Sequence, residues 1–205
     1  MSARPAPKPW PMRWIVLAIL LTLVPYTWIS LHYRKQAKPF EPYNDLKQRA
    51  NVHRLLAAGF NRIPLSADRP ADAPLASPAA QASPMPAPAG IPTVLKDALV
   101  DVPNLPDAIL SAKAAASAST LLPYVMELEC SLSDLNLGLA SSYLYLKGND
   151  LCILTDFETF AGDLRSRSRN LALRLTAPAG SIPVGDYRVI ASGARESVQW
   201  RLTVK

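Results

Sequence analysis

One uninterrupted apolar run near the start of the 205-residue chain limits its architecture more than any other feature. Trp14 to Leu31 reads WIVLAILLTLVPYTWISL and contains no charged residue. A helix of about 20 residues crosses a hydrocarbon core of about 30 Å. We therefore assign residues 14–33 to a transmembrane helix that follows a basic N-terminal tail, residues 1–13.

A cleaved signal peptide is the alternative interpretation of this run. The preceding tail is basic through Arg4, Lys8 and Arg13, and residues 15–24 have the length of a signal-peptide core. However, apolar residues continue to Leu31, and the charged sequence HYRK follows where a small-x-small cleavage site would be needed. We therefore expect an uncleaved anchor and a single-pass membrane protein.

Two arguments bear on the side of the membrane where the rest of the chain lies. Basic residues flank both ends of the span, and their count weakly favours a cytoplasmic C-terminal side. The Pro/Ala-rich segment and the β-rich domain described below are instead typical, by analogy, of bacterial extracytoplasmic modules on a stalk. We expect the N-terminus inside and the C-terminal domain in the periplasm.

The net charge of +6 is unevenly distributed along the chain. Residues 1–64 hold ten Lys/Arg and two Asp/Glu, or +8, whereas residues 65–205 hold twelve and fourteen, or −2. Basic side chains beside a membrane gain about 1 kcal/mol each near anionic headgroups, so we expect the lipid bilayer as a partner. Because the distal part has no basic surplus, nucleic acid is not expected as a partner.

Residues 34–63 are expected to form a juxtamembrane basic amphipathic helix, because apolar side chains recur there at the helical spacing i, i+3, i+4, i+8 and i+11. Three environments are open to the apolar stripe: the lipid interface, a partner protein, or this chain's own distal domain. We favour the lipid interface or a partner over the distal domain, since a flexible linker is expected to follow. The candidate interface residues are Val52, Leu55, Leu56, Phe60 and Ile63.

Residues 64–92 are expected to form a disordered Pro/Ala-rich linker. They contain eight prolines, nine alanines and no aromatic residue. Such a composition buries too little apolar surface to offset its ordering entropy and favours an extended spacer. Residues 93–120 follow as a transitional helical segment, with a short helix capped by Thr93 and a second helical stretch over Asn104–Ser117.

Residues 121–205 are expected to form a small all-β antiparallel sandwich. Six segments show apolar/polar alternation or apolar runs between turn residues, and Gly148-Asn149 joins two of them as a hairpin. The segments are 124–132, 142–147, 150–154, 170–176, 184–192 and 197–204. The stretch IPVGDYRVIASG resembles the P-x-G-x-Y-x-V pattern of immunoglobulin-like and related extracytoplasmic β-sandwiches. This resemblance covers twelve residues and implies the fold alone.

The residues that most often carry chemistry are sparse. The two histidines are His32 and His53, so a Ser-His-Asp arrangement or a histidine metal site within residues 121–205 is excluded. No Walker A loop, dinucleotide fingerprint or CxxC motif is present. We therefore expect no enzyme, no cofactor and no small-molecule substrate. A carboxylate cluster could hold Ca²⁺, but we favour a solvated loop; its members are Asp150, Asp156, Glu158 and Asp163.

Cys130 and Cys152 are the two cysteines of the chain. In an oxidising compartment they could form one disulfide. Cys130 lies on the apolar face of its expected strand, which makes a buried free thiol the default. No basic neighbour or histidine is in a position to activate either thiol.

Taken together, these features predict a non-catalytic single-pass membrane subunit, accessory or structural. Its distal β-domain and juxtamembrane helix would bind partner proteins of a cell-envelope complex. The alternative is a membrane-tethered β-sandwich module that binds a ligand or an ion at its loops. An enzyme is the least favoured class, because the catalytic constellations are missing from the distal domain.

Overall fold

The computed structural model describes residues 11–32, 42–68, 81–160 and 165–205. The chain divides into two compact units, Met1–Pro42 and Tyr43–Lys205. In chain order the elements are α1 (Met12–His32), α2 (Pro42–Ala57), β1 (Asn61–Pro64), β2 (Ser66–Asp68), β3 (Met85–Ala87), α3 (Thr93–Ala98), β4 (Ala108–Ala114), β5 (Ser117–Ala118), β6 (Tyr124–Ser131), β7 (Leu137–Lys147), β8 (Asp150–Thr159), β9 (Asn170–Ala177), β10 (Gly185–Ala191) and β11 (Ser197–Val204).

The first unit contains the apolar helix α1. Its residues are exposed from Met12 to His32, and its mean hydropathy over 18 residues is 2.0. The hydroxyls of Thr22 and Thr27 donate to carbonyl oxygens one turn earlier, at 3.0 and 2.7 Å, so these polar groups are satisfied within the helix. By length and composition α1 can cross a membrane, as the apolar run predicts.

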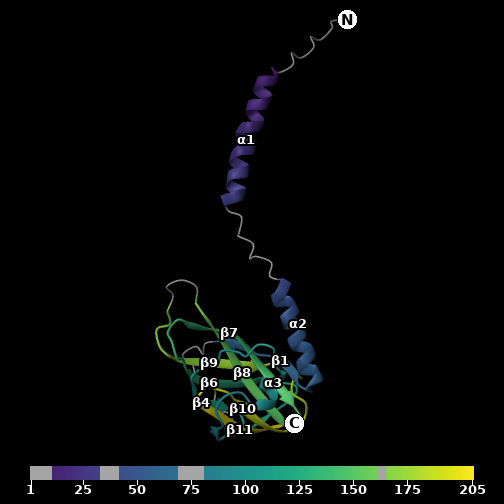
Figure 1. Cartoon of the computed structure of the whole chain (residues 1–205), viewed down its shortest axis with the longest axis vertical. Helices are drawn as coiled ribbons and strands as arrows, with labels where there is room; N and C mark the ends of the chain where they lie inside the picture. Colours follow the sequence, from purple (N-terminus) through teal and green to yellow (C-terminus); the bar gives the residue numbers. More distant parts are fainter. Residues whose placement is uncertain (1–10, 33–41, 69–80, 161–164) are drawn as a thin grey trace. The chain divides into compact units, whose positions relative to one another are not determined.

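The second unit is built on two β-sheets that form a sandwich-like domain (Figure 1). The larger sheet has seven strands in the order β1-β7-β8-β10-β11-β3, with β5 also paired to β11, and the smaller sheet has the order β2-β9-β6-β4. Most neighbours are antiparallel, but β10 runs parallel to β8 and β5 runs parallel to β11. The prediction of a purely antiparallel domain is therefore wrong for the larger sheet.

All six segments predicted as strands in residues 121–205 form strands, β6 to β11. In β6 the buried positions are Tyr124, Met126, Leu128 and Cys130, which is the alternation that the sequence predicts. Gly148, with φ of 57°, lies in the two-residue turn between β7 and β8. Glycine adopts this left-handed conformation without the steric cost that a side chain would add.

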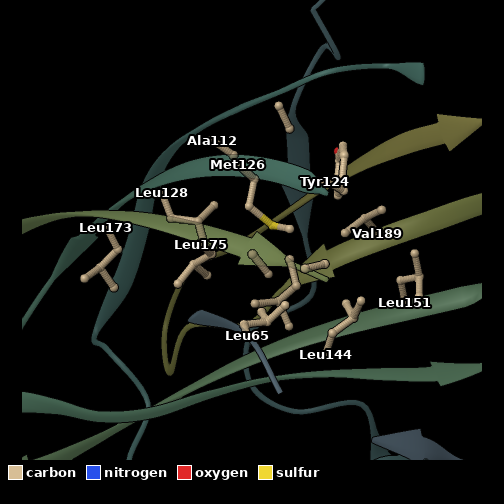
Figure 2. Packing of buried hydrophobic residues seen from close by; sticks show 14 of the residues in the cluster. Leu65, Ala112, Tyr124, Met126, Leu128, Leu144, Leu151, Leu173, Leu175 and Val189 are labelled. Atoms are coloured by element: carbon tan, nitrogen blue, oxygen red, sulfur yellow. The ribbon is translucent and has the colours of Figure 1, made fainter. Parts of the chain in front are cut away.

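The main apolar core lies between the two sheets. Figure 2 shows Met126 and Leu175 of the smaller sheet and Leu144, Leu151 and Val189 of the larger sheet directed into one common interior. These side chains are at most 1 % exposed. At about 25 cal/mol per Å² of apolar surface removed from water, this shared interior is the principal stabilising contribution to the sandwich.

A second apolar cluster covers the outer face of the larger sheet. It joins side chains of α2 and α3 to side chains of β7 and β8 that point away from the main core. Its buried members are Leu55, Phe60, Leu95, Ala98, Leu99, Tyr145, Cys152 and Leu154. The C-terminal half of α2 is therefore part of the folded β-domain, not a separate helix beyond a linker.

Two predictions for residues 64–120 are corrected by the structure. Residues 108–114 form strand β4, paired with β6, in place of the helix expected over Asn104–Ser117. Alanine is the best helix former, but intrinsic propensity is small for every residue and tertiary pairing overrides it. Strands β2 and β3 pair with β9 and β11, so both ends of the expected linker are ordered, whereas its middle, residues 69–80, lies outside the described residues. The short helix expected at Thr93 is α3, but the predicted cap is wrong, because Thr93 is the first helical residue and Pro92 occupies the N-cap without a side-chain hydrogen bond.

Leu55 and Leu56 give a matched test of the place of α2 in the fold. They are neighbours in sequence, but Leu55 is 1 % exposed and Leu56 is 60 % exposed. Leu55→Ala should lower the free energy of unfolding of the domain by about 2–5 kcal/mol, because it leaves a cavity in the second cluster. Leu56→Ala should change it by less than about 0.5 kcal/mol. Urea denaturation measures the free energy of unfolding of both variants. An unchanged free energy of unfolding in Leu55→Ala would contradict the packing of α2 on the sheet.

Candidate functional site

The site begins with the turn that ends α2. Gly59 has a φ of 80°; its N–H donates to the Leu56 carbonyl at 3.0 Å, and the Phe60 N–H donates to the Leu55 carbonyl at 2.8 Å. This pair of bonds is the Schellman motif, with glycine at the left-handed position. Leu55 and Phe60 meet in the second cluster, which supplies the apolar contact that accompanies the motif. The chain then enters β1 directly.

Helix α2 presents one polar face to its own domain. Lys47 forms an ion pair with Asp101 at 3.5 Å, and the Arg54 guanidinium donates to the Asp97 carbonyl at 2.7 Å. Between them, the Asn51 side chain accepts a hydrogen bond from the Val100 N–H at 3.3 Å. The spacing 47, 51, 54 is one side of a helix, so these contacts fix the rotation of α2 about its own axis.

A different face of α2 is directed away from these contacts. Arg49, Val52, His53 and Leu56 recur at i, i+3, i+4 and i+7, and all four are exposed. Val52 is 42 % exposed and Leu56 is 60 % exposed. This face therefore combines two apolar side chains with two basic side chains, and the domain's own core leaves it uncovered.

The exposed face of α2 forms one wall of a groove of about 550 Å³. The other wall is the edge strand β1 with Tyr143 of β7, and buried side chains form the floor. We call this feature the α2–β1 groove; its lining residues are Arg49, Val52, His53, Leu55, Leu56, Phe60, Asn61, Arg62, Pro64 and Tyr143.

The electrostatic character of the α2–β1 groove is basic. Arg49, His53 and Arg62 line it, and among the described residues that line it none is Asp or Glu. The Arg62 guanidinium lies 3.6 Å from the centroid of the Tyr143 ring, and the Lys147 ammonium lies 4.7 Å from the centroid of the Phe60 ring. Such cation–π contacts hold the positive charges close to the apolar surface.

A second hollow of about 340 Å³ lies on the other side of Arg62 and Tyr143. It is lined by the carboxylates of Asp101, Asp156 and Glu158. Asp101 is paired with Lys47, and Asp156 accepts a hydrogen bond from the Asn104 N–H at 2.8 Å.

The predicted carboxylate cluster is spread over two places within the described part of the chain. Asp150 forms an ion pair with Arg188 at 2.9 Å, next to the β7–β8 turn. Asp156 and Glu158 line the second hollow near the other end of β8. Asp163 lies outside the described residues.

The five residues predicted as an interface separate into two groups. Leu55 and Phe60 are buried in the second cluster, and Ile63 lies on β1 and is buried in the main core. Val52 and Leu56 are exposed in the α2–β1 groove. The prediction of one continuous helix to residue 63 is wrong, because Gly59 ends the helix and residues 61–64 form a strand. The less favoured alternative, packing on the chain's own domain, holds for the first group.

Sequence reasoning did not find Asn61, Arg62 and Tyr143 as neighbours of α2. Tyr143 is 81 positions after Arg62, and only the pairing of β1 with β7 brings the two together. One signal for the change of structure was present in the sequence. A glycine followed by an apolar residue at the end of a helical pattern is typical of a helix C-terminus, and Gly59-Phe60 has this form.

The two cysteines are free and buried, so the disulfide considered from the sequence is not formed. Cys130 lies in the main core, whereas Cys152 lies in the second cluster on the opposite face of the larger sheet. Burial, with a smaller contribution from Glu129, raises the pKa of Cys130 to about 12. Burial raises the pKa of Cys152 to about 11, against the opposing effect of its contact with Ser192. Both thiols are therefore unreactive at neutral pH.

Comparisons of this chain with models of protein families, with curated proteins and with solved structures find no match in any of the three.

The raised pKa values predict a loss of stability at alkaline pH. Above the ordinary thiol pKa of 9.0, the unfolded chain loses protons that the folded domain keeps on Cys130 and Cys152. The free energy of unfolding therefore falls as the pH rises from about 9 towards 11, by up to about 1.4 kcal/mol per pH unit for each thiol. Tyr124 and Tyr145, whose pKa values burial raises from 10.0 to about 12, add to the loss above pH 10.

Urea denaturation at several pH values measures this slope. Cys130→Ala should lower stability at pH 7, through its cavity, but should show a shallower decline between pH 9 and 11 than the unmodified domain. Parallel declines for the two proteins would contradict the raised pKa of Cys130.

Proposed function

We propose that this chain is a non-catalytic subunit of a cell-envelope complex, anchored in a membrane by α1, with the α2–β1 groove as the surface that binds a partner protein. The observation that carries the proposal is the division of α2 into two faces. Lys47, Asn51 and Arg54 fix one face to the domain. The face with Val52 and Leu56 stays uncovered.

The uncovered side chains have the composition of a binding surface. Val52 and Leu56 stand above the buried side chains of Leu55 and Phe60, so apolar surface is continuous from the core to the solvent. Arg62 and Tyr143 form the opposite wall, and Arg and Tyr are enriched at protein interfaces. A groove in which exposed apolar side chains lie beside polar and charged ones is typical of a peptide-binding surface.

The alternative, a module that binds a ligand or an ion at its loops, has weaker support. The hollow that carries three carboxylates is its best candidate, but Asp101 and Asp156 already have partners. The immunoglobulin-like class of the sandwich is likewise a proposal, supported by the stretch at residues 182–193.

We propose that α1 stays in the mature protein and that the domain lies on the periplasmic side. Protease added to intact spheroplasts should then remove the domain, while α1 remains with the membrane after a carbonate wash. Immunoblots against an N-terminal and a C-terminal tag measure the two fragments. Digestion of the domain only after lysis would place it in the cytoplasm, and a soluble form that lacks residues 1–31 would show a cleaved signal.

The groove itself is tested by replacing its two exposed apolar residues. The double variant Val52→Ser/Leu56→Ser should weaken the complex at least about tenfold, because the apolar contact of both side chains with the partner is lost. Blue native electrophoresis of membranes in mild detergent measures the size of the assembly. Cells should carry the tested chain as the sole copy.

Val184→Ser is the matched control, because Val184 is 70 % exposed and lies outside the groove. We expect the unmodified chain and this control to migrate as the same large assembly, and the double variant as a smaller species with an unchanged melting temperature. Equal migration of all three proteins would contradict the groove as the binding surface.

A further inference from the structure

The edge of the larger sheet borders the α2–β1 groove. Strand β1 is the outermost strand of this sheet and pairs on one side with β7. Three of its four residues, Asn61, Arg62 and Pro64, line the groove. The groove therefore has a helix on one side and, on the other, the side of β1 to which no strand of the described residues pairs.

The register of β1 shows which backbone groups face outward. Pro64 lies opposite Tyr143, and the Leu65 N–H donates to the Ser142 carbonyl at 3.0 Å. In an antiparallel pair, every second residue exchanges backbone hydrogen bonds with the neighbouring strand. Since Leu65 does so, the backbone N–H and C=O groups of Ile63 and Asn61 also point towards β7. The N–H and C=O of Arg62 and the C=O of Pro64 then point away from β7, at the edge of the sheet.

Such an edge is a template for another strand. An extended segment can hydrogen-bond to the N–H and C=O of Arg62, as peptides do when they extend an exposed sheet edge. Pro64 has no N–H and β1 is short, so the added strand is also short. Side chains of a strand alternate in direction, and every second one would therefore face Val52 and Leu56 across the groove.

Charge decides which segment the groove accepts. Arg49, His53 and Arg62 surround it, and among the described lining residues none is Asp or Glu. The stacking of Arg62 on Tyr143 keeps its guanidinium at the wall. Carboxylates form short, charge-assisted hydrogen bonds with guanidinium groups, so a segment with acidic side chains matches this lining and a basic segment is repelled.

These observations favour an extended peptide over two other occupants. An anionic membrane surface could contact Arg49 and His53, but it has no amide groups to pair with Arg62. A helix could cover Val52 and Leu56, but its own backbone groups are already bonded within the helix. We propose that the occupant of the α2–β1 groove is a short acidic segment of the partner protein that adds as a strand to β1, with acidic and apolar residues at every second position so that both kinds of side chain face α2. This inference rests on the proposed function and specifies the partner.

The test uses the full chain in nanodiscs of zwitterionic lipid and the labelled peptide acetyl-Glu-Thr-Val-Thr-Glu-Thr-amide as the probe, in which Glu, Val and Glu share one face of the strand. Fluorescence anisotropy should show saturable binding, and a Lys-for-Glu peptide should bind at least about tenfold more weakly. The double variant His53→Gln/Arg62→Gln should weaken binding of the acidic peptide about tenfold. The control variant Arg195→Gln, which changes an exposed arginine outside the groove, should bind the acidic peptide as tightly as the unmodified chain.

Two N-methylated isomers of the probe test strand addition, because they have the same charge and side chains. Methylation of the amides on one edge of the peptide should abolish binding, and methylation of those on the other edge should leave it intact. Equal binding of both isomers, or of the acidic and basic peptides, would overturn the inference. No binding at about 1 mM peptide would overturn it too.

The remaining outcomes separate this inference from the proposed function. Replacing the zwitterionic lipid by anionic lipid tests the membrane surface. Competition by that lipid for Arg49 and His53, without peptide binding, would assign the basic wall to the membrane. If the Val52→Ser/Leu56→Ser variant loses its large assembly but no peptide binds, the groove is a protein interface and the acidic strand is wrong. If the assembly also survives, both proposals fail.

Discussion

The left-handed turn at Gly59 is the constraint on which the arrangement around α2 depends. Without it, the apolar pattern from Val52 to Ile63 would continue as one helix, and β1 would not form. The turn bonds Gly59 and Phe60 back to the last turn of α2 and buries Phe60 beside Leu55. The turn also directs the chain into β1, whose Ile63 side chain is buried in the main core. A single glycine thereby joins the helix to the sheet and sets the groove between them.

The same turn explains why the apolar residues of α2 divide between the core and the surface. Phe60 and Leu55 are held in the second cluster, Lys47 is paired with Asp101 after α3, and Arg54 is bonded to Asp97 in the last turn of α3, so the helix cannot rotate. Leu56 then remains exposed in spite of its apolar character. An apolar side chain that a rigid scaffold holds in solvent needs no reorganisation before it contacts a partner, which lowers the entropic cost of binding.

The strands from β6 to β11 could be predicted because each carries its own period-two pattern or apolar run. Met126, Leu128 and Cys130 alternate with exposed or half-exposed neighbours whatever their partner strand is. Strands β2, β3 and β4 could not be predicted in this way. They are short or alanine-rich, and pairing with β9, β11 and β6 decides their conformation. Such pairing joins residues far apart in sequence, and local propensity does not report it.

The site shows the same division between local and distant signals. Val52 and Leu56 were identified from helical spacing, which is a local property, and both line the groove. The opposite wall depends on the register that sets Arg62 beside Tyr145 and Pro64 beside Tyr143. No window of sequence contains both walls. The helical spacing therefore predicted one wall of the groove correctly. It also predicted a helix that continues past Gly59, which the left-handed turn at Gly59 contradicts.

Part of the basic surplus in the N-terminal third of the chain belongs to the folded domain and not to the membrane-proximal segment. The surplus in residues 1–64 suggested contact with lipid, but four of its members belong to the folded domain. Lys47 and Arg54 are bonded to the domain itself, and Arg49 and Arg62 line the groove. The boundary in the charge distribution therefore does not coincide with the boundary of the folded unit, which begins at Tyr43. A domain whose total charge is near balance can still hold a basic groove, because its first helix and first strand carry the positive charge and its later strands carry the negative charge.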